Sequence, residues 1–124
     1  MPSGGTIEIS GIAVGKFSGT LSYDVQNEFV VALRAQGYKQ VVDASKAVPQ
    51  GVEVKVEGDT LAARTTDPRP TKLEKGEARV LEARTGRLLV KYNFVAAGPQ
   101  QVRSPAEFAR DIAALIAKDF VPRK

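Results

Sequence analysis

Residues 11–45 read GIAVGKFSGTLSYDVQNEFVVALRAQGYKQVVDAS, and within them an apolar strand pattern, a helix pattern and a second strand pattern follow one another. Apolar side chains recur at every fourth position in the middle of this stretch, which is the spacing of one face of a helix. They are Leu21, Val25, Phe29 and Leu33. Thr20 or Ser22 can act as N-cap, and Gly37 can adopt the left-handed conformation that ends a helix. The order strand, helix, strand is therefore predicted.

The residues before this helix predict one long strand with a bend. In TIEISGIAVGKF, residues 6–17, apolar residues alternate at Ile7 and Ile9 and resume out of phase at Ile12 and Val14. A β-bulge, which adds one residue to a strand, shifts the alternation in this way. We expect the bulge at Gly11, where the phase changes.

Three segments between residues 52 and 98 predict strands and a loop. In VEVKVEG, residues 52–58, alternation places Val52, Val54 and Val56 on one face and Glu53, Lys55 and Glu57 on the other. Residues 65–76, TTDPRPTKLEKG, contain two prolines and no apolar period, which predicts a loop. Residues 77–98, EARVLEARTGRLLVKYNFVAAG, alternate on both sides of RTGR, which indicates a β-hairpin.

The last helix has the clearest local signal, in SPAEFARDIAALIAKDF, residues 104–120. Ser104 as N-cap, Pro105 at the first helical position and Glu107 at the third form a capping box. One apolar stripe is expected to face the core and consists of Phe108, Ile112, Leu115, Ile116 and Phe120. Ala109 and Ala113 allow this helix to approach a sheet closely.

These segments predict an α+β fold in which two helices pack on a mixed sheet of about five strands, in the order β-α-β-β-β-β-α. A chain of 124 residues is long enough to bury one self-sufficient core. We expect a single domain over residues 6–121, preceded by a disordered tail over residues 1–5.

Several kinds of chemistry are excluded because the chain has no cysteine and no histidine. Disulfides, structural zinc, thiolate nucleophiles and imidazole bases all need one of these residues. Asp24 with Glu28, and Glu107 with Asp111, have the spacing of paired carboxylates, which is also the spacing of a solvated helix face. We therefore expect a protein that is not an enzyme and that uses no metal or cofactor.

The stretch GIAVGKF, residues 11–17, resembles a phosphate-binding loop only in outline. Such a loop needs four residues between its first glycine and the Gly-Lys pair, and a serine or threonine after the lysine. Here three residues lie between them, and Phe17 follows Lys16. The stretch is interpreted as the end of a strand.

Positive charge concentrates in residues 60–104, which carry nine basic against four acidic residues, in a chain of net charge +4. The loop sequences DPRP and RTGR present arginines where partner recognition is common. The candidate partner-binding residues are Arg64, Arg69, Arg84, Arg87 and Lys91. An uneven charge of this kind can attract an anionic partner.

Residues 11–46, together with EVKVEGDTL at 53–61 and ARVLEARTGRLLVKYNFVAAG at 78–98, resemble bacterial envelope lipoprotein domains. The group includes relatives of the curli secretion channel, the penicillin-binding-protein activator lipoproteins and the TolB N-terminal domain. In these domains an apolar strand ends in phenylalanine, a helix ends in glycine, and two later strands flank a Thr-Gly turn. The resemblance brings no shared catalytic residues.

The resemblance implies a periplasmic, non-enzymatic module that binds a protein or an anionic envelope component, or assembles with copies of itself. Attachment to the outer membrane is then expected through a lipid anchor that this chain does not carry. The alternative is a cytosolic nucleic-acid-binding domain that uses the basic hairpin at residues 79–95. In that alternative Arg84, Arg87 and Lys91 lie beside Tyr92 and Phe94 on one strand face.

Overall fold

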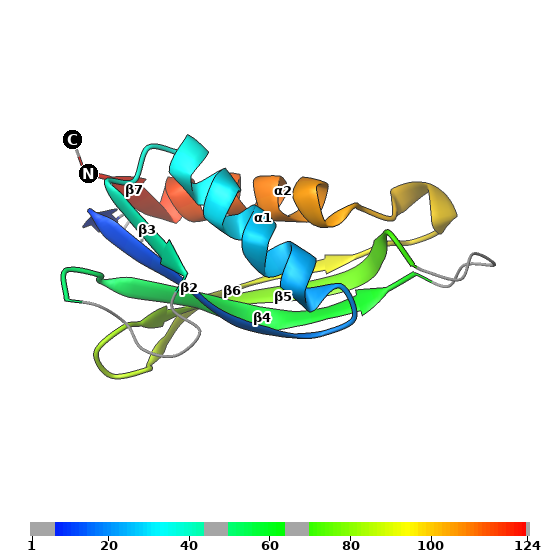
Figure 1. Ribbon diagram of the computed structural model, residues 1–124, viewed down its shortest axis with the longest axis horizontal. Helices are drawn as coiled ribbons and strands as arrows, with labels where there is room; N and C mark the ends of the chain where they lie inside the picture. The colour runs from blue at the N-terminus through cyan, green and yellow to red at the C-terminus, as the bar shows by residue number, and fades with distance from the viewer. Residues whose placement is uncertain (1–6, 44–49, 64–69, 124) are drawn as a thin grey trace.

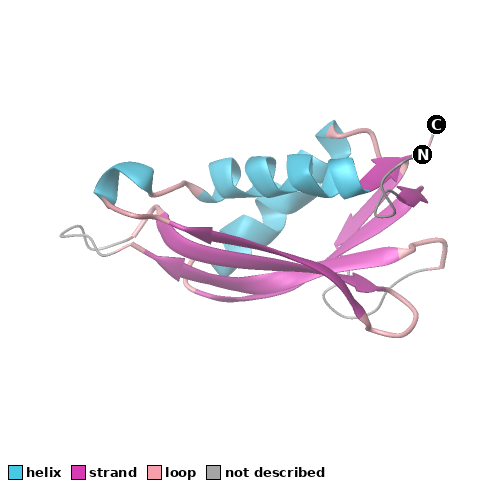
Figure 2. Cartoon of the chain, turned by 180° about the vertical axis from the view of Figure 1, so that it is seen from behind, coloured by secondary structure: helices cyan, strands magenta, loops and turns pink. Residues whose placement is uncertain are grey.

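The structure is a computed structural model that describes residues 7–43, 50–63 and 70–123. Two helices lie on one face of a five-stranded sheet, and the opposite face of the sheet carries no helix among the described residues (Figures 1 and 2). The elements are β1 Ile7–Ile9, β2 Gly11–Gly19, α1 Ser22–Ala35, β3 Gln40–Asp43, β4 Val54–Ala62, β5 Leu73–Glu82, β6 Leu88–Val95, the 3₁₀ helix η1 Pro99–Gln101, α2 Pro105–Asp119 and β7 Phe120–Pro122. The predicted α+β class is confirmed.

The main sheet has the strand order β3-β2-β4-β5-β6 and is mixed. Strand β2 pairs in parallel with β3 and β4, and β4, β5 and β6 pair antiparallel. A second sheet of two strands joins β1 to β7 in parallel, with Ile7 opposite Phe120. The first and last described elements therefore lie side by side, at the end of the molecule where Figure 1 marks both termini.

The strand predicted for residues 6–17 is divided into two strands that belong to different sheets. The division falls at Ser10, whose amide hydrogen-bonds the Glu53 carboxylate at 2.9 Å. The irregularity in the ladder of β2 with β4 lies between Val14 and Phe17. The prediction of a single strand with its bulge at Gly11 was wrong, because β1 pairs with a strand from the far end of the sequence.

Two other strand predictions need correction. Strand β5 begins at Leu73, inside the segment predicted as a loop, because the backbone of Leu73 exchanges hydrogen bonds with Arg103 at 2.6 and 3.0 Å. Val54 and Val56 lie in the main core, whereas Val52 precedes β4 and packs with Ala13 in a separate small cluster. The hairpin prediction is confirmed, with Gly86 at φ 77° in the turn between β5 and β6.

Helix α1 ends as predicted but begins differently. Gly37 has φ 99° directly after the helix, and Val25, Phe29 and Leu33 are buried. The N-cap is Leu21, at φ 61°, and no side chain caps the helix. The Thr20 hydroxyl instead accepts a hydrogen bond from the Ala62 amide at 2.7 Å, which ties the start of α1 to the end of β4. The prediction of Thr20 or Ser22 as N-cap was therefore wrong.

Helix α2 begins with the predicted capping box. Ser104 Oγ accepts from the Glu107 amide at 3.2 Å, and Glu107 Oε1 accepts from the Ser104 amide at 3.0 Å. The hydrogen bond from the Ser104 amide to the Glu107 carboxylate is the main cause of the lowered pKa of Glu107. Phe108, Ile112 and Ile116 are buried as expected, whereas Leu115 is 42% exposed and its assignment to the core was wrong. Phe120, although buried, lies beyond the helix in β7.

A chain of aromatic rings fills one part of the core. Phe17 stacks on Phe29 at 5.1 Å between ring centroids, and Phe29 meets Phe108 edge to face at 5.9 Å. Phe94 of β6 continues the chain at 6.1 Å from Phe108. Gly76 makes room for it, because a Cβ there would stand 2.6 Å from the Phe108 ring. Both helices are thereby packed against β2 and β6 through aromatic contacts.

Replacement of Ser104 and Phe108 tests how α2 is held. Ser104→Ala removes the acceptor of the Glu107 amide and should cost about 1 kcal/mol of unfolding free energy. Phe108→Ala removes a ring from the aromatic chain and should cost about 3–5 kcal/mol. Leu115→Ala, at a half-exposed position of the same helix, is the control and should cost less than Phe108→Ala. Denaturant titrations that show equal losses at residues 108 and 115 would contradict this description of α2.

Tyr38 provides a test by pH. Its hydroxyl donates to the Phe120 carbonyl, and burial raises its pKa to about 12. The folded state therefore holds the phenol proton more tightly than the unfolded state, whose pKa is near 10. This stabilisation is complete below pH 10 and is lost as the pH rises toward 12.

The advantage in unfolding free energy of the wild type over Tyr38→Phe should consequently shrink between pH 10 and 12. Tyr23→Phe, at a tyrosine that is 75% exposed, is the control for the loss of a tyrosine hydroxyl at the surface. Denaturant titrations at several pH values measure both differences. A constant difference between the wild type and Tyr38→Phe over this range would argue against a buried phenol.

Candidate functional site

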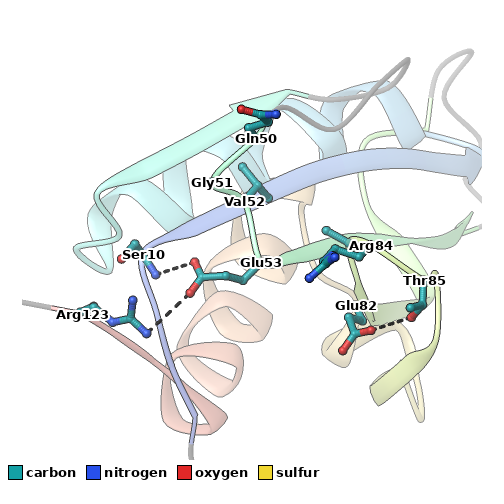
Figure 3. Close-up of a pocket in the computed structure, with 10 residues that line it drawn as sticks. Ser10, Gln50, Gly51, Val52, Glu53, Glu82, Arg84, Thr85 and Arg123 are labelled. Carbon is teal, nitrogen blue, oxygen red and sulfur yellow. Dashed lines mark hydrogen bonds and ion pairs between the residues drawn. The ribbon is translucent and has the colours of Figure 1, made fainter.

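A cleft of about 1030 Å³ lies where the two sheets meet (Figure 3). Its walls come from the junction of β1 and β2, from the segment before β4, from the turn after β5 and from the residue after β7. The lining residues are Ser10, Gln50, Gly51, Val52, Glu53, Glu82, Ala83, Arg84, Thr85 and Arg123. The cleft is therefore built from segments that are far apart in the sequence.

Glu53 and Arg123 are held together inside this cleft. Glu53 Oε1 accepts from the amides of Ser10 and Gly11 at 2.9 and 3.0 Å, and its Oε2 lies 3.7 Å from Arg123 Nη2 (Figure 3). The Arg123 side chain also donates to the Glu8 carbonyl at 3.1 Å. These contacts join the small sheet to the main sheet, so both charges already have partners within the fold.

The turn between β5 and β6 supplies the other charged groups. Thr85 donates through its hydroxyl to Glu82 Oε1 at 2.7 Å, so this carboxylate is also engaged. Arg84 and Arg87 are exposed on the same turn. Within residues 7–43, 50–63 and 70–123, neither guanidinium forms a hydrogen bond or an ion pair. Of the two cations that line the cleft, Arg123 is paired and Arg84 has no partner among the described residues, and Arg87 lies next to Arg84 on the turn.

Lys91, the third residue expected near the hairpin, lies in a different setting. On the sheet face opposite the helices, Lys91 Nζ is 3.8 Å from Glu77. Arg79 bonds both Glu77 and Asp59, and the hydrogen bond to Asp59 is the main cause of the raised pKa of Arg79. Lys91 is therefore part of an ion-pair network, separate from the two arginines of the turn. Arg64 and Arg69 lie outside the described residues, as does the tail at residues 1–5.

The aromatic residues of β6 do not lie beside these cations. Tyr92 donates to Asp119 Oδ2 at 2.5 Å, and burial with this bond raises the pKa of Tyr92. Phe94 packs against Phe108, with the Arg103 guanidinium 5.7 Å from its ring centroid. Both side chains point to the helices, on the face opposite Lys91. The expectation that they share one strand face with the basic residues was wrong.

The carboxylate pairs noted in the sequence do not gather into a metal site. Among the described residues, no group of three or more aspartate or glutamate side chains is arranged to hold a metal ion. Glu107 belongs to the capping box, and Asp111 lies 3.5 Å from Arg103. Asp24 and Glu28 border a smaller hollow of about 490 Å³ beside the start of α2. No helix in the described part of the chain has the length and apolar character needed to cross a bilayer.

Sequence reasoning identified Arg84 and Arg87 but missed Ser10, Glu53 and Arg123. The loop position of RTGR was a usable signal. The alternation in residues 52–58 predicts only that Glu53 lies on the exposed side of a strand, and nothing near Arg123 in the sequence indicates that β7 reaches β1. The cleft depends on that long-range pairing, which local patterns do not encode.

No protein-family model matches the sequence, and no curated protein matches it. Solved structures share its fold. The PelC dodecamer from Paraburkholderia phytofirmans superposes with a TM-score of 0.61 at 14% identity, over 98% of this chain and 96% of the PelC chain. Protein XCC0632 from Xanthomonas campestris superposes with a TM-score of 0.55 at 11% identity, over 95% of this chain and 86% of its own. These similarities show that the chain has the fold of PelC and XCC0632.

Proposed function

We propose that this domain is a non-enzymatic recognition module of the bacterial cell envelope, which binds an acidic group of a partner protein or another anionic envelope component at the cleft. The observation that carries the proposal is which charged side chains at the cleft have a partner within the fold and which do not. Glu53, Glu82 and Arg123 are satisfied internally, while Arg84 and the adjacent Arg87 present guanidinium groups without a partner in the described part of the chain. Guanidinium groups suit carboxylates and phosphates because they donate two parallel hydrogen bonds.

The assignment to the envelope rests on the sequence resemblance of residues 11–46, 53–61 and 78–98 to envelope lipoprotein domains. A periplasmic location and a lipid tether upstream of the domain follow from that resemblance. The absence of cysteine and histidine from the chain favours recognition over catalysis, since a thiolate nucleophile and an imidazole base are both missing.

We propose further that the module acts as an assembly of identical copies. PelC, which shares this fold over almost the whole of both chains, forms a dodecamer. The side chains exposed here include large apolar ones, among them Leu88, Val95 and Leu115. A contact between copies would remove such groups from water.

The charge-reversal variant Arg84→Glu/Arg87→Glu tests recognition at the cleft. This variant should capture at least tenfold less partner from a bacterial envelope extract than the wild type does, because two cations become anions at the binding surface. The control variant Arg110→Glu/Lys118→Glu makes the same charge change on the exposed side of α2 and should capture the partner as the wild type does. Melting temperatures of both variants should stay near that of the wild type, since exposed charges contribute little to stability.

Equal losses in the two variants would refute recognition at the cleft, because only the total charge would then matter.

A titration with single-stranded oligonucleotides distinguishes the nucleic-acid alternative. Binding that weakens steeply with rising salt and is lost in Arg84→Glu/Arg87→Glu would favour that alternative over the envelope module. We expect no oligonucleotide binding near physiological salt.

A further inference from the structure

Strand β6 forms one edge of the main sheet, and no strand within residues 7–43, 50–63 and 70–123 pairs with its outer side. The Ala96 amide donates to the Glu74 carbonyl at 2.8 Å, which sets the phase of the ladder with β5. In an antiparallel ladder only alternate residues bond to a given neighbour. Val90, Tyr92 and Phe94 therefore bond to β5, whereas the amides and carbonyls of Lys91, Asn93 and Val95 point away from the sheet.

This edge has few of the features that discourage pairing with another strand. Between Leu88 and Val95 there is no proline or glycine, and Lys91 is the only charged residue. Val95 is 64% exposed and Leu88 is 51% exposed. Edge strands are commonly protected by prolines, by several charges or by a covering segment, and a long edge without them is a template for another strand.

The helix above the edge provides a second, independent observation. Asp111, Leu115 and Asp119 are spaced four apart and so lie on one side of α2. Asp119 accepts from Tyr92, and Asp111 pairs with Arg103, whose guanidinium stands over the ring of Phe94. Leu115 lies between these two anchored aspartates and is 42% exposed. An apolar side chain is thus left open to water directly above the free edge of β6.

We propose that β6 is an interface between two copies of this chain, which pair antiparallel about a two-fold axis at Asn93. This inference rests on the proposed assembly of identical copies and names the surface that forms it. In this register Asn93 faces Asn93 of the second copy, and Lys91 faces Val95. A register centred on Lys91 would place two ammonium groups opposite each other, which is destabilising.

The proposed pairing is self-complementary on both faces of the sheet. On the inner face Tyr92 of each copy faces Phe94 of the other, an aromatic pair of the kind that stabilises neighbouring strands. An axis perpendicular to the sheet keeps the helices of both copies on the same face. Leu115 of each copy then lies over the two paired β6 strands and is removed from water. A strand pair of this kind joins copies in twos, so larger assemblies have an even number of copies.

A cysteine cross-link tests the register, because the natural chain has no cysteine. Residues that face each other in a hydrogen-bonded antiparallel pair have Cα atoms about 5.5 Å apart, within the range of a disulfide. Asn93→Cys should therefore give a covalent dimer under mild oxidation. Lys91→Cys is the matched control on the same edge, where the two copies of residue 91 are about 14 Å apart along the strands. Cross-linking at residue 91 in preference to residue 93 would overturn the proposed register.

Sedimentation measurements test the interface itself. Asn93→Pro removes an amide that points away from β5, and Leu115→Glu places a charge over the two paired β6 strands. Each should lower the sedimenting mass to half that of the wild type or less. Asn93→Thr, which keeps the amide, and Ala114→Glu, beside residue 115 on α2, are the controls and should leave the mass unchanged. Circular dichroism should show all four variants folded.

The possible failures are distinguishable. A wild-type chain that is monomeric at every concentration would overturn both the proposed assembly and the β6 interface. An assembled wild type whose mass is unchanged by Asn93→Pro and Leu115→Glu would overturn the interface and leave the assembly standing. Neither result depends on recognition at the cleft, which is tested by Arg84 and Arg87.

Discussion

The close approach of the helices to the sheet depends on bare backbone in the two central strands. Gly58 on β4 and Gly76 on β5 lie beneath aromatic rings, and a Cβ at either position would collide with a ring or with neighbouring backbone. The rings of Phe17, Phe29 and Phe108 fill this space, with Phe29 in contact with both of the others. Aromatic rings pack at preferred distances and tilts. The absence of a side chain at Gly58 and Gly76 therefore determines where the rings lie, and with them helices α1 and α2.

The sequence predicted the elements that are specified by neighbouring residues. The capping box of Ser104 and Glu107 lies within one helical turn, and the turn at Gly86 joins adjacent strands, so both are visible in a short window. The pairing of β1 with β7 joins Ile7 to Phe120, 113 residues apart, and the start of β5 at Leu73 depends on Arg103, 30 residues away. No local pattern reports such long-range partners.

The candidate site divides in the same way. Arg84 and Arg87 were found because loop position and charge are visible in the sequence, whereas Glu53 and Arg123 meet only through the tertiary fold. The two faces of β6 were confused for a related reason. Alternation shows that Lys91 and Tyr92 point in opposite directions, but only the positions of α2 and Glu77 show which direction leads to the core.

The parallel pairing of β1 with β7 has a mechanical consequence. Because these strands run in the same direction, Ile7 lies at one end of the pair and Pro122 at the other. A pulling force applied between the two ends of the domain therefore slides the strands along each other and loads their hydrogen bonds together, rather than opening them one after another. The contacts of Arg123 with Glu8 and Glu53 add to the resistance at the same place. The fold is thus built to remain closed when tension is applied through its ends.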